Sequence, residues 1–125
     1  MFGRRNFYFG DNISVGVRDV NRAVAWYQEK LGLRLTPFRS EDLDAFLAFD
    51  KDDEIGLALV VIPEGETEAN VEGHPILYTK RIEAAHQEFA SKSVAVGPIQ
   101  SDSGGNRFFR FQDLDGNEIE VCVEP

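Results

Sequence analysis

The chain has one cysteine, few basic residues and no long apolar run. The single cysteine, Cys122, excludes a disulfide within the chain and is typical of proteins from a reducing compartment. No apolar run reaches the length of a transmembrane helix, and Arg4-Arg5 precede only a short aromatic stretch rather than the apolar core of a signal peptide. These absences predict a cytoplasmic protein with no membrane partner.

Acidic residues outnumber basic ones by 22 to 13, which gives a net charge of -9. A negative surface repels phosphate backbones, so we expect no nucleic-acid partner. Hydrophobic residues make up 42% of the chain, which indicates a globular protein. Its 125 residues suit one domain over 1–125, or two small units that share a core.

The stretch from 108 to 123 has the pattern of a strand, a tight turn and a second strand. Asp115-Gly116-Asn117 supplies turn residues that tolerate positive φ. The last strand alternates, with three apolar residues on one face: Ile119, Val121 and Val123. Glu120 and Cys122 therefore point to the other face, where a carboxylate meets either water or a cavity.

The rest of the chain predicts two β-α-β-β-β units. In the first we expect strands at 13–17, 33–38, 45–50 and 55–62, with a helix that begins after Asp19 and ends at Gly32. The Glu-rich segment 63–73 is expected to be a solvated linker. In the second unit we expect strands at 75–79, 94–99, 107–112 and 117–123, with a helix at 82–90.

A shift of 62 residues places the second half of the sequence on the first. Phe46 to Phe49 fall on Phe108 to Phe111, and Lys30 falls on Lys92. The matching order of apolar and turn positions indicates two copies of one unit. Under the same shift Asn12 falls on His74 and Ala58 falls on Glu120, so only the second half has a histidine and a glutamate there.

Two stretches of the chain resemble the vicinal oxygen chelate superfamily. They are NISVGVRDVNRAVAWYQEKLGL at 12–33, which is similar to the opening of that family's fold, and DLDGNEIE at 113–120, which is similar to its closing motif. The family includes glyoxalase I, the extradiol dioxygenases, and the fosfomycin- and bleomycin-resistance proteins. The closing motif usually has proline where this chain has Leu114.

The resemblance implies an α+β fold in which two βαβββ modules form an open, cup-like mixed sheet with the helices outside. Module one would span about 7–62, the linker 63–73, and module two about 74–125. In metal-dependent members the ligands come from the first and fourth strands of each module. The matching positions here are Asn12, Ala58, His74 and Glu120. Asn12 replaces the usual histidine and Ala58 the usual Glu or Gln, so the ligand set is incomplete.

His74 and Glu120 are the candidate catalytic and metal-binding residues. Without the repeat, His74 would be an ordinary loop histidine and Glu120 an ordinary outward carboxylate. In an apolar pocket the pair could instead move a proton or hold a divalent metal weakly, with Zn, Ni, Fe and Mn as candidates. Further residues share these faces and would line the pocket: Asn12, Ser14, Ala58, Ile76, Tyr78 and Cys122. Arg107 and Arg110 point to opposite faces of one strand, and we interpret both as solvated, with contact to an anionic substrate as the alternative for one of them. In the same strand, Phe108, Phe109 and Phe111 are interpreted mostly as core, with an aromatic wall of the pocket as the alternative for one face.

Two functions follow from the resemblance. The first is a protein similar to the bleomycin-resistance branch, which binds a small organic molecule in the cup and has an incomplete metal site. The alternative is a metal-dependent lyase, isomerase or dioxygenase that uses His74 and Glu120. A structural or regulatory dimer with a relic pocket is a third possibility. The resemblance also implies a homodimer, because such pockets lie between chains in relatives.

Overall fold

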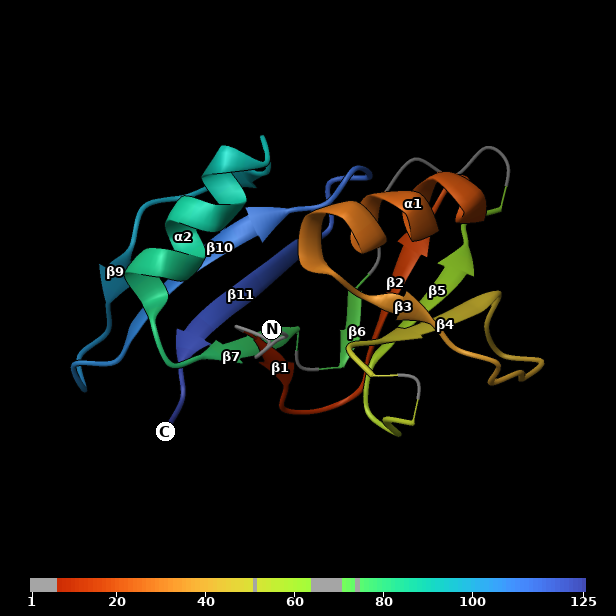
Figure 1. Ribbon diagram of the computed structural model, residues 1–125, viewed down its shortest axis with the longest axis horizontal. Helices are drawn as coiled ribbons and strands as arrows, with labels where there is room; N and C mark the ends of the chain where they lie inside the picture. The colour runs from red at the N-terminus through yellow and green to blue at the C-terminus, as the bar shows by residue number, and fades with distance from the viewer. Residues whose placement is uncertain (1–6, 51, 64–70, 74) are drawn as a thin grey trace.

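The computed structural model describes residues 7–50, 52–63, 71–73 and 75–125. Within them the protein has an α+β fold with two helices and two open mixed sheets (Figure 1). This confirms the predicted fold class. His74 and residues 64–70, most of the predicted linker, lie outside the described residues. Neither helix has the length and apolar character that crossing a membrane requires, as far as the described residues show.

The first sheet has the strand order β3–β4–β5–β2–β6. Its strands are β2 (Ile13–Val17), β3 (Arg34–Leu35), β4 (Ala45–Ala48), β5 (Leu57–Val61) and β6 (Val71–Gly73). The second sheet has the order β1–β7–β11–β10–β8, with β9 also paired to β10. Its strands are β1 (Tyr8–Phe9), β7 (Ile76–Thr79), β8 (Ala95–Val96), β9 (Gln100–Ser101), β10 (Arg107–Gln112) and β11 (Glu118–Val123).

Helix α1 (Val20–Leu31) begins and ends as its sequence predicts. The Asp19 carboxylate accepts a hydrogen bond from the backbone N–H of Arg22 at 3.1 Å, which satisfies a donor of the first turn. Gly32 ends the helix with a φ of 75°, a conformation that disfavours residues with a Cβ. Helix α2 (Ile82–Ser91) extends one residue beyond its predicted end.

Each helix packs on one face of a sheet, α1 on the first and α2 on the second (Figure 1). The strand residues on that face are buried, and they include Val15, Leu47, Leu57, Leu59, Leu77, Phe109, Phe111, Ile119 and Val121. Burying one such side chain contributes about 1.5–3 kcal/mol, so these faces supply the core. No helix in the described part of the chain covers the opposite faces.

The two halves repeat the same strand register. Ser14 pairs with Ala58 in the parallel strands β2 and β5, and Ile76 pairs with Glu120 in β7 and β11. Both pairs span 44 residues and lie 62 residues apart. Lys30 and Lys92, which are related by the same shift, each donate a hydrogen bond to the other's backbone carbonyl, at 2.6 and 3.4 Å. This reciprocity is what two residues beside a pseudo-twofold axis would show.

The third strand of each half departs from the predicted alignment. Phe46 lies opposite Ala58, whereas Arg110 lies opposite Glu120, so these strands are related by 64 residues instead of 62. The alignment of Phe46 with Phe108 is therefore wrong. The reason is the longer first turn, since nine residues separate the paired Leu47 and Leu57 and seven separate Phe111 and Ile119.

Short edge strands also differ from the prediction. Residues 71–73 form β6 on the first sheet instead of ending a linker, and β1, which was expected within module one, joins the second sheet. The strands expected at 33–38 and 94–99 shorten to β3 and β8. Short edge strands are held by backbone hydrogen bonds, which do not require a particular side-chain pattern. The acidic composition of the linker therefore gave no sign of β6.

A buried hydrogen-bond network attaches the turn between β10 and β11 to α1. The Tyr27 hydroxyl donates to Asp113 Oδ2 at 2.7 Å, and Asn117 Nδ2 donates to the same oxygen at 2.9 Å and to the Gly16 carbonyl at 2.8 Å. Asp113 Oδ1 accepts the backbone N–H groups of Asp115 and Asn117. Burial and the Asp113 carboxylate raise the pKa of Tyr27 well above its usual range, so this tyrosine stays a neutral donor.

Candidate functional site

The helix-free face of the second sheet gathers four of the candidate residues, Ile76, Tyr78, Glu120 and Cys122. Tyr8 pairs with Tyr78, Tyr78 with Cys122, and Cys122 with Phe108, so these four side chains form a row across β1, β7, β11 and β10. Paired residues in neighbouring strands point to the same face. We call Tyr8, Tyr78 and Phe108 the aromatic row.

Tyr78 is held in place by its neighbours in this row. Its ring centroid lies 5.6 Å from that of Tyr8. The ring also lies so close to Gly10 that a Cβ at that position would overlap it. The Tyr8 hydroxyl donates to Glu124 Oε2 at 2.7 Å, which anchors the outer end of the row and raises the pKa of Tyr8. The row therefore presents two ordered rings to solvent.

A charged pair lies next to the aromatic row. Ile76, Glu120 and Arg110 are paired across β7, β11 and β10. Arg110 Nη2 lies 3.3 Å from Glu120 Oε1, and its guanidinium lies 5.1 Å from the centroid of the Phe108 ring. These contacts place a donor and an acceptor beside an aromatic face.

Cys122 takes part in the same cluster as a donor. Its Sγ lies 2.9 Å from Glu120 Oε2, and burial together with the Glu120 carboxylate raises the pKa of the thiol to about 12. The thiol is thus protonated at neutral pH. Because a nucleophilic cysteine needs the thiolate, this geometry favours a hydrogen-bond donor rather than a nucleophile.

A hollow of about 270 Å³ opens beside Glu120. It is lined by Pro75, Ile76, Arg110, Glu118 and Glu120, and all of them except Pro75 belong to strands of the second sheet. The candidates Ile76 and Glu120 therefore meet at one hollow, and Tyr78 and Cys122 lie in the adjacent row.

The candidates of the first half lie on the other sheet. Ser14 and Ala58 are paired neighbours, with Phe46 opposite Ala58. Asn12 Oδ1 accepts a hydrogen bond from the backbone N–H of Gly56 at 2.8 Å, so this oxygen holds the chain at the start of β5. The structure thus brings the candidates together in two groups, one on each sheet.

The donors that the structure describes do not complete the metal site that the family resemblance implies. Among the residues that the structure describes, no group of three His, Cys, Asp or Glu side chains is placed to hold a metal ion. Glu120 is engaged by Arg110 and Cys122, and Ala58 offers no ligand atom. A catalytic zinc site usually has three protein ligands. His74, the remaining candidate, lies outside the described residues.

The sequence did not predict Tyr8 on this face, and it offered an aromatic wall that includes Phe108 only as an alternative to a core role. Arg110 was interpreted as solvated, yet it contacts both Glu120 and Phe108. A signal was present, because the turn at 115–117 fixes the register of the hairpin and therefore the residue opposite Glu120. Tyr8 had no such signal, since β1 pairs with a strand 70 residues away.

Solved structures with the same fold include three instructive relatives. A superfamily member from Sphaerobacter thermophilus DSM 20745 has 20% identity and a TM-score of 0.71, over 93% of this chain and 97% of its own. TnmS3, an antibiotic binding protein from Streptomyces sp. CB03234, has 26% identity and a TM-score of 0.67, over 90% and 92%. The fosfomycin resistance protein FosX from Listeria monocytogenes has 14% identity and a TM-score of 0.65, over 92% of each chain.

No curated protein sequence matches the chain. The sequence pattern of one family does, and it covers residues 11–121, almost the whole length. This range includes both halves of the fold and every candidate site residue except Cys122, which lies one position beyond it. The chain therefore belongs to the Glyoxalase/Bleomycin resistance protein/Dioxygenase superfamily.

Proposed function

We propose that the protein binds a small organic molecule on the open face of the second sheet. The ligand would have a planar apolar part and a hydrogen-bonding group. The observation that carries this proposal is the Arg110–Glu120 pair, which lies beside the rings of Tyr78 and Phe108 at the hollow. Half-buried rings offer a stacking surface, and the charged pair offers a directed acceptor and donor.

The relatives support binding as the function. TnmS3 is an antibiotic binding protein and FosX a fosfomycin resistance protein. The contacts of Glu120 also favour binding, because this carboxylate accepts a hydrogen bond from Cys122 and forms an ion pair with Arg110. A metal-dependent enzyme that uses His74 and Glu120 would first have to separate Glu120 from Arg110 and Cys122.

We further propose that the protein holds divalent metal at less than one ion per site when purified without chelators. Among the described residues, Glu120 does not have two further metal-ligand side chains beside it, whereas zinc usually has three protein ligands. Elemental analysis for Zn, Ni, Fe and Mn tests this. One tightly bound ion per site would contradict it and would support the lyase, isomerase or dioxygenase alternative.

A homodimer is the assembly we propose. Apolar side chains lie exposed on and just after the edge strand β3, where Leu35 is 47% and Phe38 is 53% exposed. Exposed apolar groups at a sheet edge are typical of a surface that pairs with another chain. Sedimentation equilibrium should give twice the chain mass, and a monomer at micromolar concentration would contradict the proposal. A cytoplasmic location is proposed with it, on the evidence of the single cysteine.

The binding proposal can be tested with 2-naphthol, a planar ligand with one hydroxyl. In an NMR titration we expect shifts at Tyr78, Phe108, Arg110 and Glu120. Phe108→Ala should weaken binding about fivefold, because an aromatic contact is worth about 1 kcal/mol. Val61→Ala is the control, since it truncates an exposed apolar side chain of the first half that belongs neither to the site nor to the proposed dimer surface. Equal losses in the two variants would overturn the proposal.

A further inference from the structure

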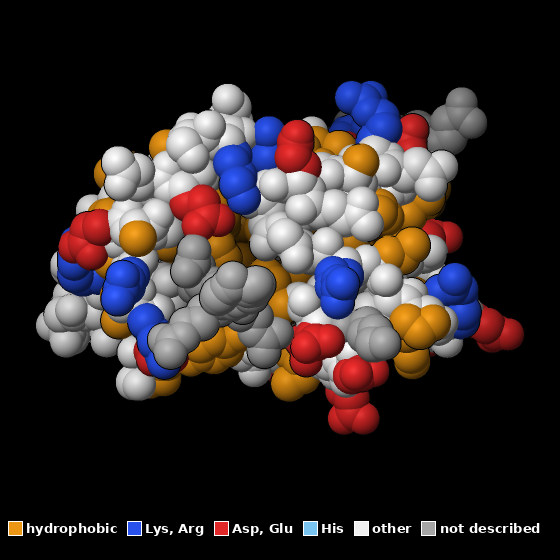
Figure 2. Space-filling view, viewed as in Figure 1, with side chains coloured by type: hydrophobic (Ala, Val, Ile, Leu, Met, Phe, Trp, Pro, Cys, Tyr) orange, Lys and Arg blue, Asp and Glu red, His pale blue; other side chains and the backbone are white. Residues whose placement is uncertain are grey.

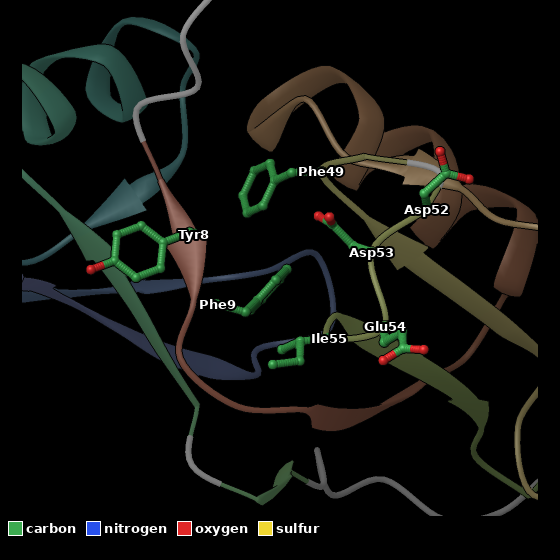
Figure 3. A pocket seen from close by; sticks show the side chains of 7 residues that line it. All are labelled: Tyr8, Phe9, Phe49, Asp52, Asp53, Glu54 and Ile55. Atoms are coloured by element: carbon green, nitrogen blue, oxygen red, sulfur yellow. The ribbon is translucent and has the colours of Figure 1, made fainter.

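A larger hollow, of about 500 Å³, lies between β1 and the turn that joins β4 to β5 (Figure 3). Phe9, Phe49 and Ile55 point into the same space from these segments. The ring centroids of Phe9 and Phe49 are 5.3 Å apart, and Ile55 is 43% exposed. The hollow therefore has an apolar wall that is open to solvent, and its volume lies within the usual range for a small-molecule site.

The opposite wall of this hollow is acidic. Asp52, Asp53 and Glu54 complete the lining, and none of its seven described residues is basic. Figure 3 shows the Asp53 carboxylate directed toward the aromatic side, whereas those of Asp52 and Glu54 are directed away from it. Figure 2 shows acidic side chains gathered at the lower edge of the molecule, where this turn lies. Asp53 also accepts the backbone N–H of Asp50 at 3.2 Å, which fixes its position.

This hollow has a different lining from the smaller one, although Tyr8 borders it and is also the outer member of the aromatic row. Tyr8 and Phe9 are neighbours in β1 and point to opposite sides of it, so Phe9 does not belong to the aromatic row. Neither Glu120 nor Arg110 lines the larger hollow, and neither Phe9 nor Phe49 lines the smaller one. A ligand of the larger hollow would therefore leave the Glu120 and Arg110 side chains accessible.

We propose that this hollow is a second binding site and that it takes a small organic cation, such as an aromatic or alkyl ammonium. Ring faces attract a cation through their quadrupole, and the Asp53 carboxylate adds a direct opposite charge. The net charge of -9 draws cations toward the surface and repels anions. An apolar part of the same molecule would pack on Ile55 and the two rings.

The experiment compares benzylamine, benzyl alcohol and benzoate, which have nearly the same size and differ in charge at pH 7. Each is titrated into the full-length protein and followed by two-dimensional NMR. Benzylamine should bind about tenfold more tightly than benzyl alcohol, as expected for a cation held by rings and one carboxylate. The shifts should map to residues 8–9, 49 and 52–55, and benzoate should not bind. Equal binding of amine and alcohol, or shifts at 76, 78, 108 and 120, would overturn the proposal.

Two charge variants separate a local contact from the general field. Asp53→Asn should weaken benzylamine about fivefold, because it removes the carboxylate that faces the rings. Glu41→Gln lowers the net negative charge equally at an exposed site outside the hollow, and it should leave the affinity nearly unchanged. Equal weakening in both variants would refute a defined site. The comparison of the three probes on the wild-type protein stands even if a variant fails to fold.

Discussion

The two halves of the molecule have the same backbone arrangement and differ in the side chains on their open faces. At matching positions of the open faces, the first half has Ala58 and Phe46, and the second has Glu120 and Arg110. The parallel register around them is the same in both halves. Backbone pairing thus tolerates very different side chains on a face that does not pack against a helix, and the charged cluster exists only in the second half.

The turns before the last strand of each half also differ in the residues that they contact. The turn at 113–117 is fixed by buried hydrogen bonds to Tyr27 and Gly16 of the other half. The connection between the paired Leu47 and Leu57 is two residues longer than that between Phe111 and Ile119, and its described residues line an open hollow with Tyr8 and Phe9. One turn therefore joins the halves, and the other leaves room for a ligand between them.

The largest effect should come from removing the centre of the buried network. Asp113→Ala would leave the Tyr27 hydroxyl and two backbone N–H groups without their acceptor, and we expect a loss of about 3 kcal/mol or more in the free energy of unfolding. Asp53→Ala, in the turn of the first half, should cost less than about 1 kcal/mol. Urea unfolding measures both, and equal losses would break the comparison of the turns.

A smaller loss is expected for Tyr27→Phe, which removes one buried hydrogen bond. We predict about 1–2 kcal/mol in urea unfolding, because Asp113 loses a donor. Tyr8→Phe is the control, since its hydroxyl bonds Glu124 at the surface and should contribute less than about 0.5 kcal/mol. A larger loss for Tyr8→Phe would show that the network does not join the halves.

Burial of the Tyr27 hydroxyl should also make the free energy of unfolding depend on pH. Its pKa is raised in the folded state, so its contribution is complete below the unfolded pKa of about 10 and is lost as pH rises toward the folded value. The wild type should lose stability above about pH 10 more steeply than Tyr27→Phe. Parallel stability curves for the two proteins in that range would contradict the burial of this hydroxyl.

The smallest effect concerns the reactivity of Cys122. Since its pKa is raised to about 12, alkylation by iodoacetamide at neutral pH should be much slower than for a small free thiol. Glu120→Gln removes one cause of the raised pKa and should speed alkylation several-fold, although burial remains the larger cause. Unchanged alkylation in Glu120→Gln would mean that the carboxylate does not hold the thiol.

The sequence predicted the elements that local patterns specify. The capping residues Asp19 and Gly32 set the bounds of α1, and the 62-residue shift aligned the first and fourth strands of the two halves. Strands β1 and β6 were not predicted because each pairs with a strand that is distant in the sequence. Strand β1 pairs with β7 of the second half, and β6 pairs with β2 of the first half. The shift failed on the third strands, where the longer first turn moves Phe46 opposite Ala58.

The candidate site was predictable only in part. Alternation in β11 identified the face of Glu120 and Cys122, and the structure places both on it. Predicting Arg110 and the aromatic row would have required the register between neighbouring strands, which the sequence pattern of a single strand does not give. The second hollow depends on segments that lie about 40 residues apart, so no local pattern could indicate it.

The most direct test of the account is to locate 2-naphthol on the protein by intermolecular nuclear Overhauser effects. If the difference between the halves decides where a ligand binds, contacts should appear to the rings of Tyr78 and Phe108 and to Ile76, all on the second sheet. Contacts to Phe38 and Phe46 of the first half would contradict the claim that the charged second face is the binding site.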